Sequence, residues 1–248
     1  MLPPRMEIEV HDTGPPQPLR PSRFTFPDVR LARAEGLVAW GGDFAPGTLI
    51  EAYRHGVFPW PHRQEERLWF SPDPRAIIPP GGLHISRRLA RTIRQGRFRV
   101  TLNAAFERVI DGCADREDET WITPAYRRGY VRLHELGWAH SIETWSADGS
   151  LAGGLYGVNT GGLFGAESMF HRVSDASKVA MVAMVQHCGD AGVSLIDVQV
   201  LTPHVQRMGA VEIPRDEYLR RLGEVKDLPI SFCGKSARTA AGPASQGS

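Results

Sequence analysis

The sequence predicts an α+β fold in which helices flank a central, mostly antiparallel sheet. Residues 139–170 contain three strand-like segments separated by Gly-containing turns, which is the pattern of an antiparallel meander. A strongly apolar helix over 174–192 follows the meander, and a buried strand over 194–201 follows the helix. A meander followed by a helix and another strand is typical of the α+β class.

The chain divides into four parts. Residues 1–22 carry six prolines and are expected to form a flexible arm, and residues 231–248 are expected to form a disordered tail. Residues 23–75 are punctuated by Pro and Gly and rich in aromatic side chains, and they predict a small N-terminal α/β domain with one clear helix over 45–56. Residues 76–230 are expected to form the larger domain.

The larger domain begins with alternating helix and strand patterns. Helices are expected over 84–96, 103–114 and 123–137, with a strand over 97–103 between the first two. A last helix is expected over 215–223. Together with the meander, these elements supply the helices that would cover the sheet.

The composition excludes several classes of protein. The 248 residues carry a formal net charge of +1, so any basic patch must be local. No window approaches the roughly 20 apolar residues of a membrane helix, and the N-terminus lacks the apolar centre of a secretory signal. Cys113, Cys188 and Cys233 lie far apart, which argues against a zinc site and a disulfide framework. We therefore expect a cytoplasmic protein without a membrane or metal partner.

An acidic and an amide side chain interrupt the apolar strand over 194–201. Asp197 and Gln199 are two positions apart, so in an extended strand both side chains point to the same face. One interpretation is an edge strand in which one of the two bonds a neighbouring backbone group. The other is the floor of a pocket, where a desolvated carboxylate acts as a base or orients one. The residues alone leave both open.

A second carboxylate lies in an apolar setting. Glu167 is flanked by Phe164, Met169 and Phe170, and a buried carboxylate requires a partner. Arg172 and Lys178 are close in sequence and are the structural candidates. A cationic group on a ligand is the functional alternative.

A basic run follows in the helix over 84–96. From Arg87 to Arg99 every charged residue is an arginine, and no acid interrupts the run. The run is either a solvated helix face or a surface for phosphate groups. The members proposed to contact a phosphate backbone are Arg87, Arg88, Arg91 and Arg94.

Seven ordered segments resemble the bacterial leucyl/phenylalanyl-tRNA–protein transferases, from about Phe26 to Leu222. They are "GLVAWGGDFAPGTLIEAYRHGVFPW", "LWFSPDPRAII", "HISRRL", "TWITPAYRRGYVRLHELGWAHSIETW", "LAGGLYGV", "ESMFHRVSDASKVA" and "LIDVQVLTPHVQRMGAVEIPR". The resemblance implies a small N-terminal domain and a catalytic domain with an acyltransferase (GNAT-like) fold. It also implies transfer of Leu or Phe from its tRNA to the N-terminal Arg or Lys of an acceptor protein, which marks that protein for degradation under the N-end rule. No cofactor is implied.

The resemblance assigns roles to individual residues. Asp197 and Gln199 would relay the proton of the attacking amine, and Glu167 would lie in the same catalytic site. Trp60 and Trp121 would flank the terminal adenosine of the tRNA. The full set of implied substrate-binding residues is Tyr53, Trp60, Trp121, Tyr130, Leu155, Phe164, Ala166, Ser168, Met181, Met184 and Ile196.

Two other functions remain as alternatives. An acetyl-CoA-dependent N-acyltransferase of the same fold would need a [QR]xxGx[GA] loop for the pyrophosphate, and the nearest stretch, residues 206–211, lacks the final small residue. A non-catalytic RNA-binding module would explain the arginines but would leave Glu167, Asp197 and Gln199 without a role.

Overall fold

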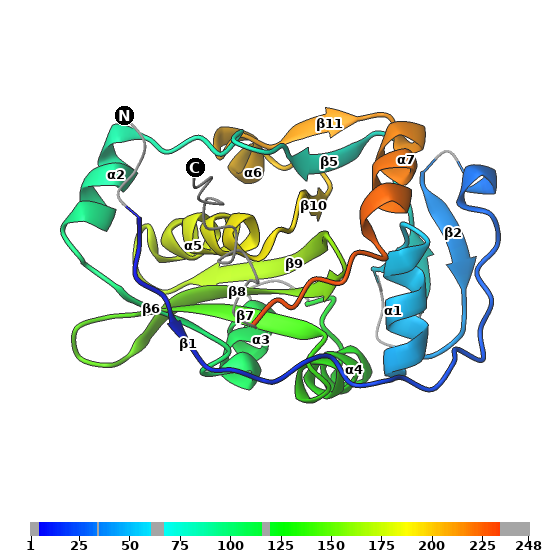
Figure 1. The fold of residues 1–248 in the computed structure, drawn as a ribbon, viewed down its shortest axis with the longest axis horizontal. Helices are drawn as coiled ribbons and strands as arrows, with labels where there is room; N and C mark the ends of the chain where they lie inside the picture. Colours follow the sequence, from blue (N-terminus) through cyan, green and yellow to red (C-terminus); the bar gives the residue numbers. More distant parts are fainter. Residues whose placement is uncertain (1–4, 34, 61–66, 116–119, 234–248) are drawn as a thin grey trace, which may run out of the picture.

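The computed structural model describes residues 5–33, 35–60, 67–115 and 120–233, and one large sheet organises most of this chain (Figure 1). Within these ranges the sheet has eight strands in the order β1-β6-β7-β8-β9-β10-β5-β11. Their bounds are Glu9–Val10 (β1), Arg75–Ile78 (β5), Arg99–Leu102 (β6), Ala139–Trp145 (β7), Leu151–Thr160 (β8), Leu163–His171 (β9), Leu195–Gln199 (β10) and Val211–Ile213 (β11). Five of the seven pairings are antiparallel, while β1 with β6 and β9 with β10 are parallel. The predicted α+β class is confirmed, and the sheet is mixed.

Helices cover both faces of the meander formed by β7, β8 and β9. Helices α3 (Phe106–Ala114) and α4 (Pro124–Glu135) pack on one face, and α5 (Ala176–Ala191) packs on the other. Neighbouring residues of β8 divide between the two cores, because Leu155 packs with α5 and Tyr156 packs with α3 and α4. This alternation is expected for a strand that is buried on both faces.

A second sheet and the helix α1 form the N-terminal region. The sheet has the strand order β2-β4-β3, and the bounds are Leu37–Trp40 (β2), Phe58–Pro59 (β3), Leu68–Phe70 (β4) and Pro46–Arg54 (α1). Gly56 follows α1 with φ +75°, a conformation that favours glycine. Helix α7 (Arg215–Val225) lies beside α1 in Figure 1, and a Cβ at Gly56 would lie 2.7 Å from Leu219 Cδ2. The last helix therefore packs on the N-terminal region.

The remaining predicted elements are also present. The helix expected over 84–96 is α2 (Arg87–Arg94), and the strand expected over 97–103 is β6. The short helix α6 (Pro203–Arg207) and the strands β5 and β11 had no predicted counterpart. In the described part of the chain, no helix has the length and apolar content needed to cross a membrane.

The arm and the start of the tail are more ordered than expected. Of the arm, residues 5–22 are described, and β1 pairs with β6. The backbone of Met6 exchanges hydrogen bonds of 2.9 and 2.8 Å with the Gln186 side chain, so this segment is packed rather than loose. Of the tail, residues 234–248 lie outside the described residues, but Phe232 is 3% exposed and stacks on Phe164 with 5.1 Å between ring centroids.

Candidate active site

A cavity of about 470 Å³ opens where β9 and β10 stop pairing. The two strands pair only from Leu195 to Asp197 on β10 and from Leu163 to Gly165 on β9. Beyond these residues both strands line the cavity, together with the loop after β3, α5 and α6. The predicted site residues that line it are Trp60, Trp121, Leu155, Ala166, Glu167, Ser168, Met181 and Gln199. His171, Ser177, Thr202 and His204 also line it and were not predicted.

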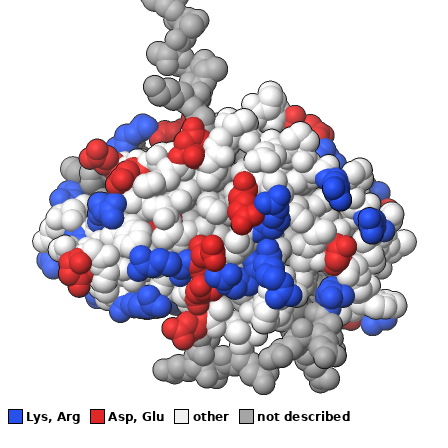
Figure 2. All heavy atoms as spheres, turned by 90° about the horizontal axis from the view of Figure 1, so that it is seen from below, with Lys and Arg blue, Asp and Glu red and all other residues white. Residues whose placement is uncertain are grey.

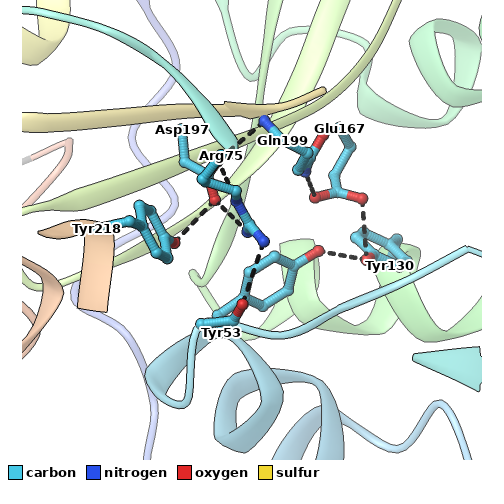
Figure 3. A network of polar contacts seen from close by, with 8 residues as sticks. Tyr53, Arg75, Tyr130, Glu167, Asp197, Gln199 and Tyr218 are labelled. Atoms are coloured by element: carbon cyan, nitrogen blue, oxygen red, sulfur yellow. Dashed lines mark hydrogen bonds and ion pairs between the residues drawn. The ribbon is translucent and has the colours of Figure 1, made fainter. Parts of the chain in front are cut away.

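Asp197 lies behind the cavity in a buried network with Arg75 (Figure 3). Both side chains are at most 1% exposed. Arg75 donates from Nε to Oδ1 at 2.9 Å and from Nη2 to Oδ2 at 2.6 Å, and the Tyr218 hydroxyl donates to Oδ2 at 2.9 Å. The carboxylate raises the pKa of the Arg75 guanidinium above its usual range. The oxygens of Asp197 are therefore occupied by protein donors.

Gln199 does not share a face with Asp197, contrary to the expectation from their spacing. A register shift separates the two residues in the pairing of β10 with β5, and Gln199 has φ +62°. Its backbone N–H donates to Asp197 Oδ1 at 2.9 Å, whereas its side chain turns toward Glu167. The expected side-by-side pair is thus replaced by a backbone link, because the irregularity breaks the alternation of the strand.

Glu167 occupies the wall of the cavity and accepts hydrogen bonds from neutral groups. Gln199 Nε2 donates to Oε1 at 2.7 Å, and the hydroxyls of Tyr126 and Tyr130 donate to Oε2 at 2.7 and 3.2 Å. Burial raises the pKa of Glu167 to about 7, and the tyrosine hydrogen bonds act in the opposite direction. In the described residues, no Lys or Arg lies within ion-pair distance of Glu167.

Neither of the two basic residues considered as partners of Glu167 pairs with it. Arg172 is paired with Asp115 at 3.9 Å, and Lys178 is paired with Asp175 at 2.9 Å. Both basic residues therefore neutralise acids near the start of α5 and near the end of α3. Glu167 is instead held at the cavity wall by hydrogen bonds from Gln199, Tyr126 and Tyr130.

Three predicted apolar residues lie deeper than the cavity surface. Phe164, Met184 and Ile196 belong to the same buried cluster as Leu155 and Met181, but they do not line the cavity. Tyr53 and Tyr130 also lie behind the wall, where their hydroxyls are 2.5 Å apart and Tyr130 contacts Glu167. Burial raises the pKa of both tyrosines well above the usual value, which keeps them protonated as donors.

The predicted tRNA-binding arginines are exposed on α2. Arg88 contacts Asp175 at 3.3 Å and also donates to Ser174 at 3.3 Å, so it lies at the N-terminus of α5. Arg87, Arg91 and Arg94 have no acidic partner among the described residues. On the face that Figure 2 shows, basic and acidic side chains are intermixed.

Sequence reasoning missed the residues that hold the site together. Arg75, Tyr126 and Tyr218 were not among the predicted site residues, although they bind the two central carboxylates. A signal did exist, because a carboxylate on a buried strand requires hydrogen-bond donors or a cation. For Asp197 that cation comes from β5, which is 122 positions away in sequence.

Comparison with known proteins identifies the family. The family model described as leucyl/phenylalanyl-tRNA protein transferase matches residues 77–223, and the model of its N-terminal domain matches residues 42–73. A leucyl/phenylalanyl-tRNA–protein transferase of Anaeromyxobacter sp. (strain Fw109-5) is 52% identical over 213 residues, which cover 84% of this chain and 90% of that protein. The protein of the same name from Proteus mirabilis is 45% identical over 227 residues, which cover 92% and 94%.

Among solved structures, L-PGS from Bacillus licheniformis is 16% identical with a TM-score of 0.35, over 53% of this chain and 47% of that one. A structural similarity this low supports no inference about this chain. The sequence matches define the class of the protein, which is an aminoacyltransferase. The chain belongs to the leucyl/phenylalanyl-tRNA protein transferase family.

Proposed function

We propose that this chain transfers Leu or Phe from a charged tRNA to the N-terminal Arg or Lys of an acceptor protein, creating a degradation signal. Family membership supports an aminoacyl-tRNA substrate and a protein acceptor. The observation that carries the proposal is the cavity between β9 and β10, which combines apolar walls with the polar groups of Glu167 and Gln199. These are the two surfaces that an apolar aminoacyl group and an attacking amine require.

The reaction is the aminolysis of an ester. The acceptor's α-amine nitrogen attacks the aminoacyl carbonyl carbon, and the bond from that carbon to the ribose oxygen breaks. The nitrogen loses a proton and the ribose oxygen gains one, leaving as a hydroxyl. Because the α-ammonium of a protein has a pKa of about 8, it must first lose another proton to become nucleophilic. The site must therefore accept a proton and hold the amine.

Glu167 is suited to accept that first proton. Its pKa of about 7 is roughly one unit below that of the ammonium, so the transfer costs about 1.4 kcal/mol. A carboxyl at the usual value of 4.5 would lie roughly 3.5 units lower, and the same transfer would cost about 5 kcal/mol. Burial thus makes Glu167 a much better base than an exposed glutamate.

Gln199 and Asp197 support the amine in different ways. Gln199 uses its Nε2 to hold Glu167, which leaves its amide oxygen as an acceptor for the incoming amine. Asp197 acts as a positioning residue, because it fixes the left-handed backbone of Gln199 through the N–H of that residue. In this assignment Asp197 does not accept the proton itself, since it is ion-paired with Arg75 and does not line the cavity.

The apolar part of the cavity would hold the aminoacyl side chain. Leu155 and Met181 supply this wall, and the flexible thioether of Met181 adapts to both Leu and Phe. A β-branched side chain would crowd the wall near Cα, which such a pocket rejects by about 1–3 kcal/mol. Trp60 and Trp121 would flank the terminal adenosine, because both rings line the same cavity.

We further propose the domain division and the cellular setting. Residues 76–230 would form a GNAT-like acyltransferase domain, an assignment supported by the parallel strands β9 and β10 that diverge around the cavity. Residues 23–75 would form the small N-terminal domain, which contains the three-stranded sheet. The protein would act in the cytoplasm, where charged tRNA is available.

A transfer assay tests the function directly. Labelled Leu-tRNA and Phe-tRNA would be mixed with peptides that begin with Arg, Lys or Ala and are otherwise identical. We expect label on the Arg and Lys peptides and little on the Ala peptide. Acetyl-CoA with the same peptides serves as the comparison, and acetyl transfer without aminoacyl transfer would refute the proposal.

A further inference from the structure

A second cavity of about 780 Å³ lies beside α5 and has no role in the chemistry described above. The ordered arm forms one wall, from Arg5 to Glu9. The end of α2 and the segment that leads into β6 form another, and Val179 of α5 contributes as well. The cavity therefore depends on the segment that the sequence predicted to be a flexible arm.

The two cavities flank the first turns of α5. Ser177 and Met181 line the first cavity and are four positions apart, so they lie on the same side of the helix. Val179 lies between them in sequence and roughly opposite them on the helix, and it lines the second cavity. Helix α5 thus lies between the two cavities at this point. Arg88 lies at the N-terminus of the same helix.

The second cavity combines positive charge with apolar surface. Four arginines and two glutamates line it, and one glutamate, Glu9, is already paired with Arg99 at 2.8 Å. Arg94 and Arg97 have no acidic partner in the part of the chain that the structure describes. The guanidinium of Arg97 lies 5.6 Å from the ring centroid of Phe98, which also lines the cavity. A phosphate and an attached base would find matching surfaces here.

We propose that the second cavity binds a nucleotide of the tRNA strand that leads to the aminoacylated end, with its phosphate on Arg94 and Arg97 and its base against Phe98. This inference rests on the proposed function, because it places the end of the same strand in the first cavity. The arginines of α2 would connect the two positions. Arg88 and Arg94 are six residues apart, which corresponds to about 9 Å along the helix.

The test is the salt dependence of tRNA binding by Arg97→Ala. Each phosphate contact contributes roughly 0.7 to 0.9 to the slope of log affinity against log salt concentration. We expect the slope to fall by that amount. The affinity at 0.1 M salt should fall about sixfold, which is the effect of that slope difference between 1 M and 0.1 M salt. Arg97→Lys should keep the slope. The matched control is Arg33→Ala, an exposed arginine between the short 3-10 helix Val29–Leu31 and β2. Strand β2 lies far from α2 in Figure 1.

Kinetics separate this inference from the proposed function. Aminoacyl-adenosine reaches only the first cavity, so Arg97→Ala should leave its kcat/KM nearly unchanged. With aminoacyl-tRNA as the substrate, the same variant should lower kcat/KM by about sixfold more. If the parent protein transfers from tRNA and Arg97→Ala matches Arg33→Ala in affinity and slope, the second site is refuted and the function stands. If the parent shows no transfer, the function itself is wrong. Loss of AMP binding without any loss of tRNA binding would identify a free-nucleotide site and overturn the assignment to tRNA.

Discussion

Replacing Glu167 with Gln should make the protein more stable in alkaline solution while it lowers activity. Because the folded protein binds the Glu167 proton more tightly than the unfolded chain does, ionisation weakens folding as the pH rises from about 4.5 to about 7. The shift corresponds to about 3 kcal/mol of stability, lost over that window and constant above it. Gln at this position has no proton to lose, but it sacrifices about 1 kcal/mol of hydrogen bonding.

The difference in free energy of unfolding, variant minus parent, should therefore increase by about 3 kcal/mol between pH 4.5 and pH 8. Urea unfolding at several pH values measures it, and Glu212→Gln on β11 provides a control with an exposed carboxyl. A difference that stays constant with pH would refute the high proton affinity of Glu167. The transfer rate of Glu167→Gln should fall by about 100-fold or more, which is the lower range for loss of a general base.

Three further substitutions probe the site and its surroundings. Tyr126→Phe removes a hydrogen bond that lowers the pKa of Glu167, so the acidic limb of the kcat/KM profile should move to higher pH; an unmoved limb would mean that another group controls it. Asp197→Asn breaks a buried ion pair and should cost about 3 kcal/mol or more of stability, with a large loss of turnover but little change in tRNA affinity measured on folded protein. Replacing both Arg91 and Arg94 with Ala should lower the salt slope of tRNA binding by about 1.5, and an unchanged slope would remove α2 from the tRNA-binding surface.

Local patterns predicted most of the fold. The meander, α5 and the helices α2, α3, α4 and α7 follow from apolar periodicity and from Gly or Pro at their ends, which act within a few residues. The β1 and β11 strands could not be predicted in this way, because each is only two or three residues long and is defined by its partner. The arm from Arg5 to Val10 is ordered by β6 and α5, which are distant in sequence.

Some members of the candidate site could be predicted from the sequence, but its geometry could not. The position of Glu167 and Gln199 on the cavity wall follows from polar residues on apolar strands. The different surroundings of Asp197 and Gln199 could not be predicted, because they depend on a register shift that no residue type in the strand indicates. The partner of Asp197 was equally hidden, because Arg75 reaches it through the pairing of β5 with β10.

We infer that the buried Arg75–Asp197 ion pair serves mainly to position Gln199. Pairs of this kind are often no more stabilising than apolar residues of similar volume, so stability does not explain the Arg75–Asp197 contact. The left-handed backbone of Gln199 costs on the order of 1–3 kcal/mol and needs surroundings that hold it in place. Asp197 supplies this restraint through its bond to the Gln199 N–H, while Arg75 also donates to the carbonyl of Gly56 at 3.2 Å. The guanidinium of Arg75 thus connects the carbonyl of Gly56, after α1, with Asp197, and Asp197 in turn holds the backbone of Gln199. A substitution that breaks either contact of Arg75 should therefore displace Gln199, whose side chain holds Glu167.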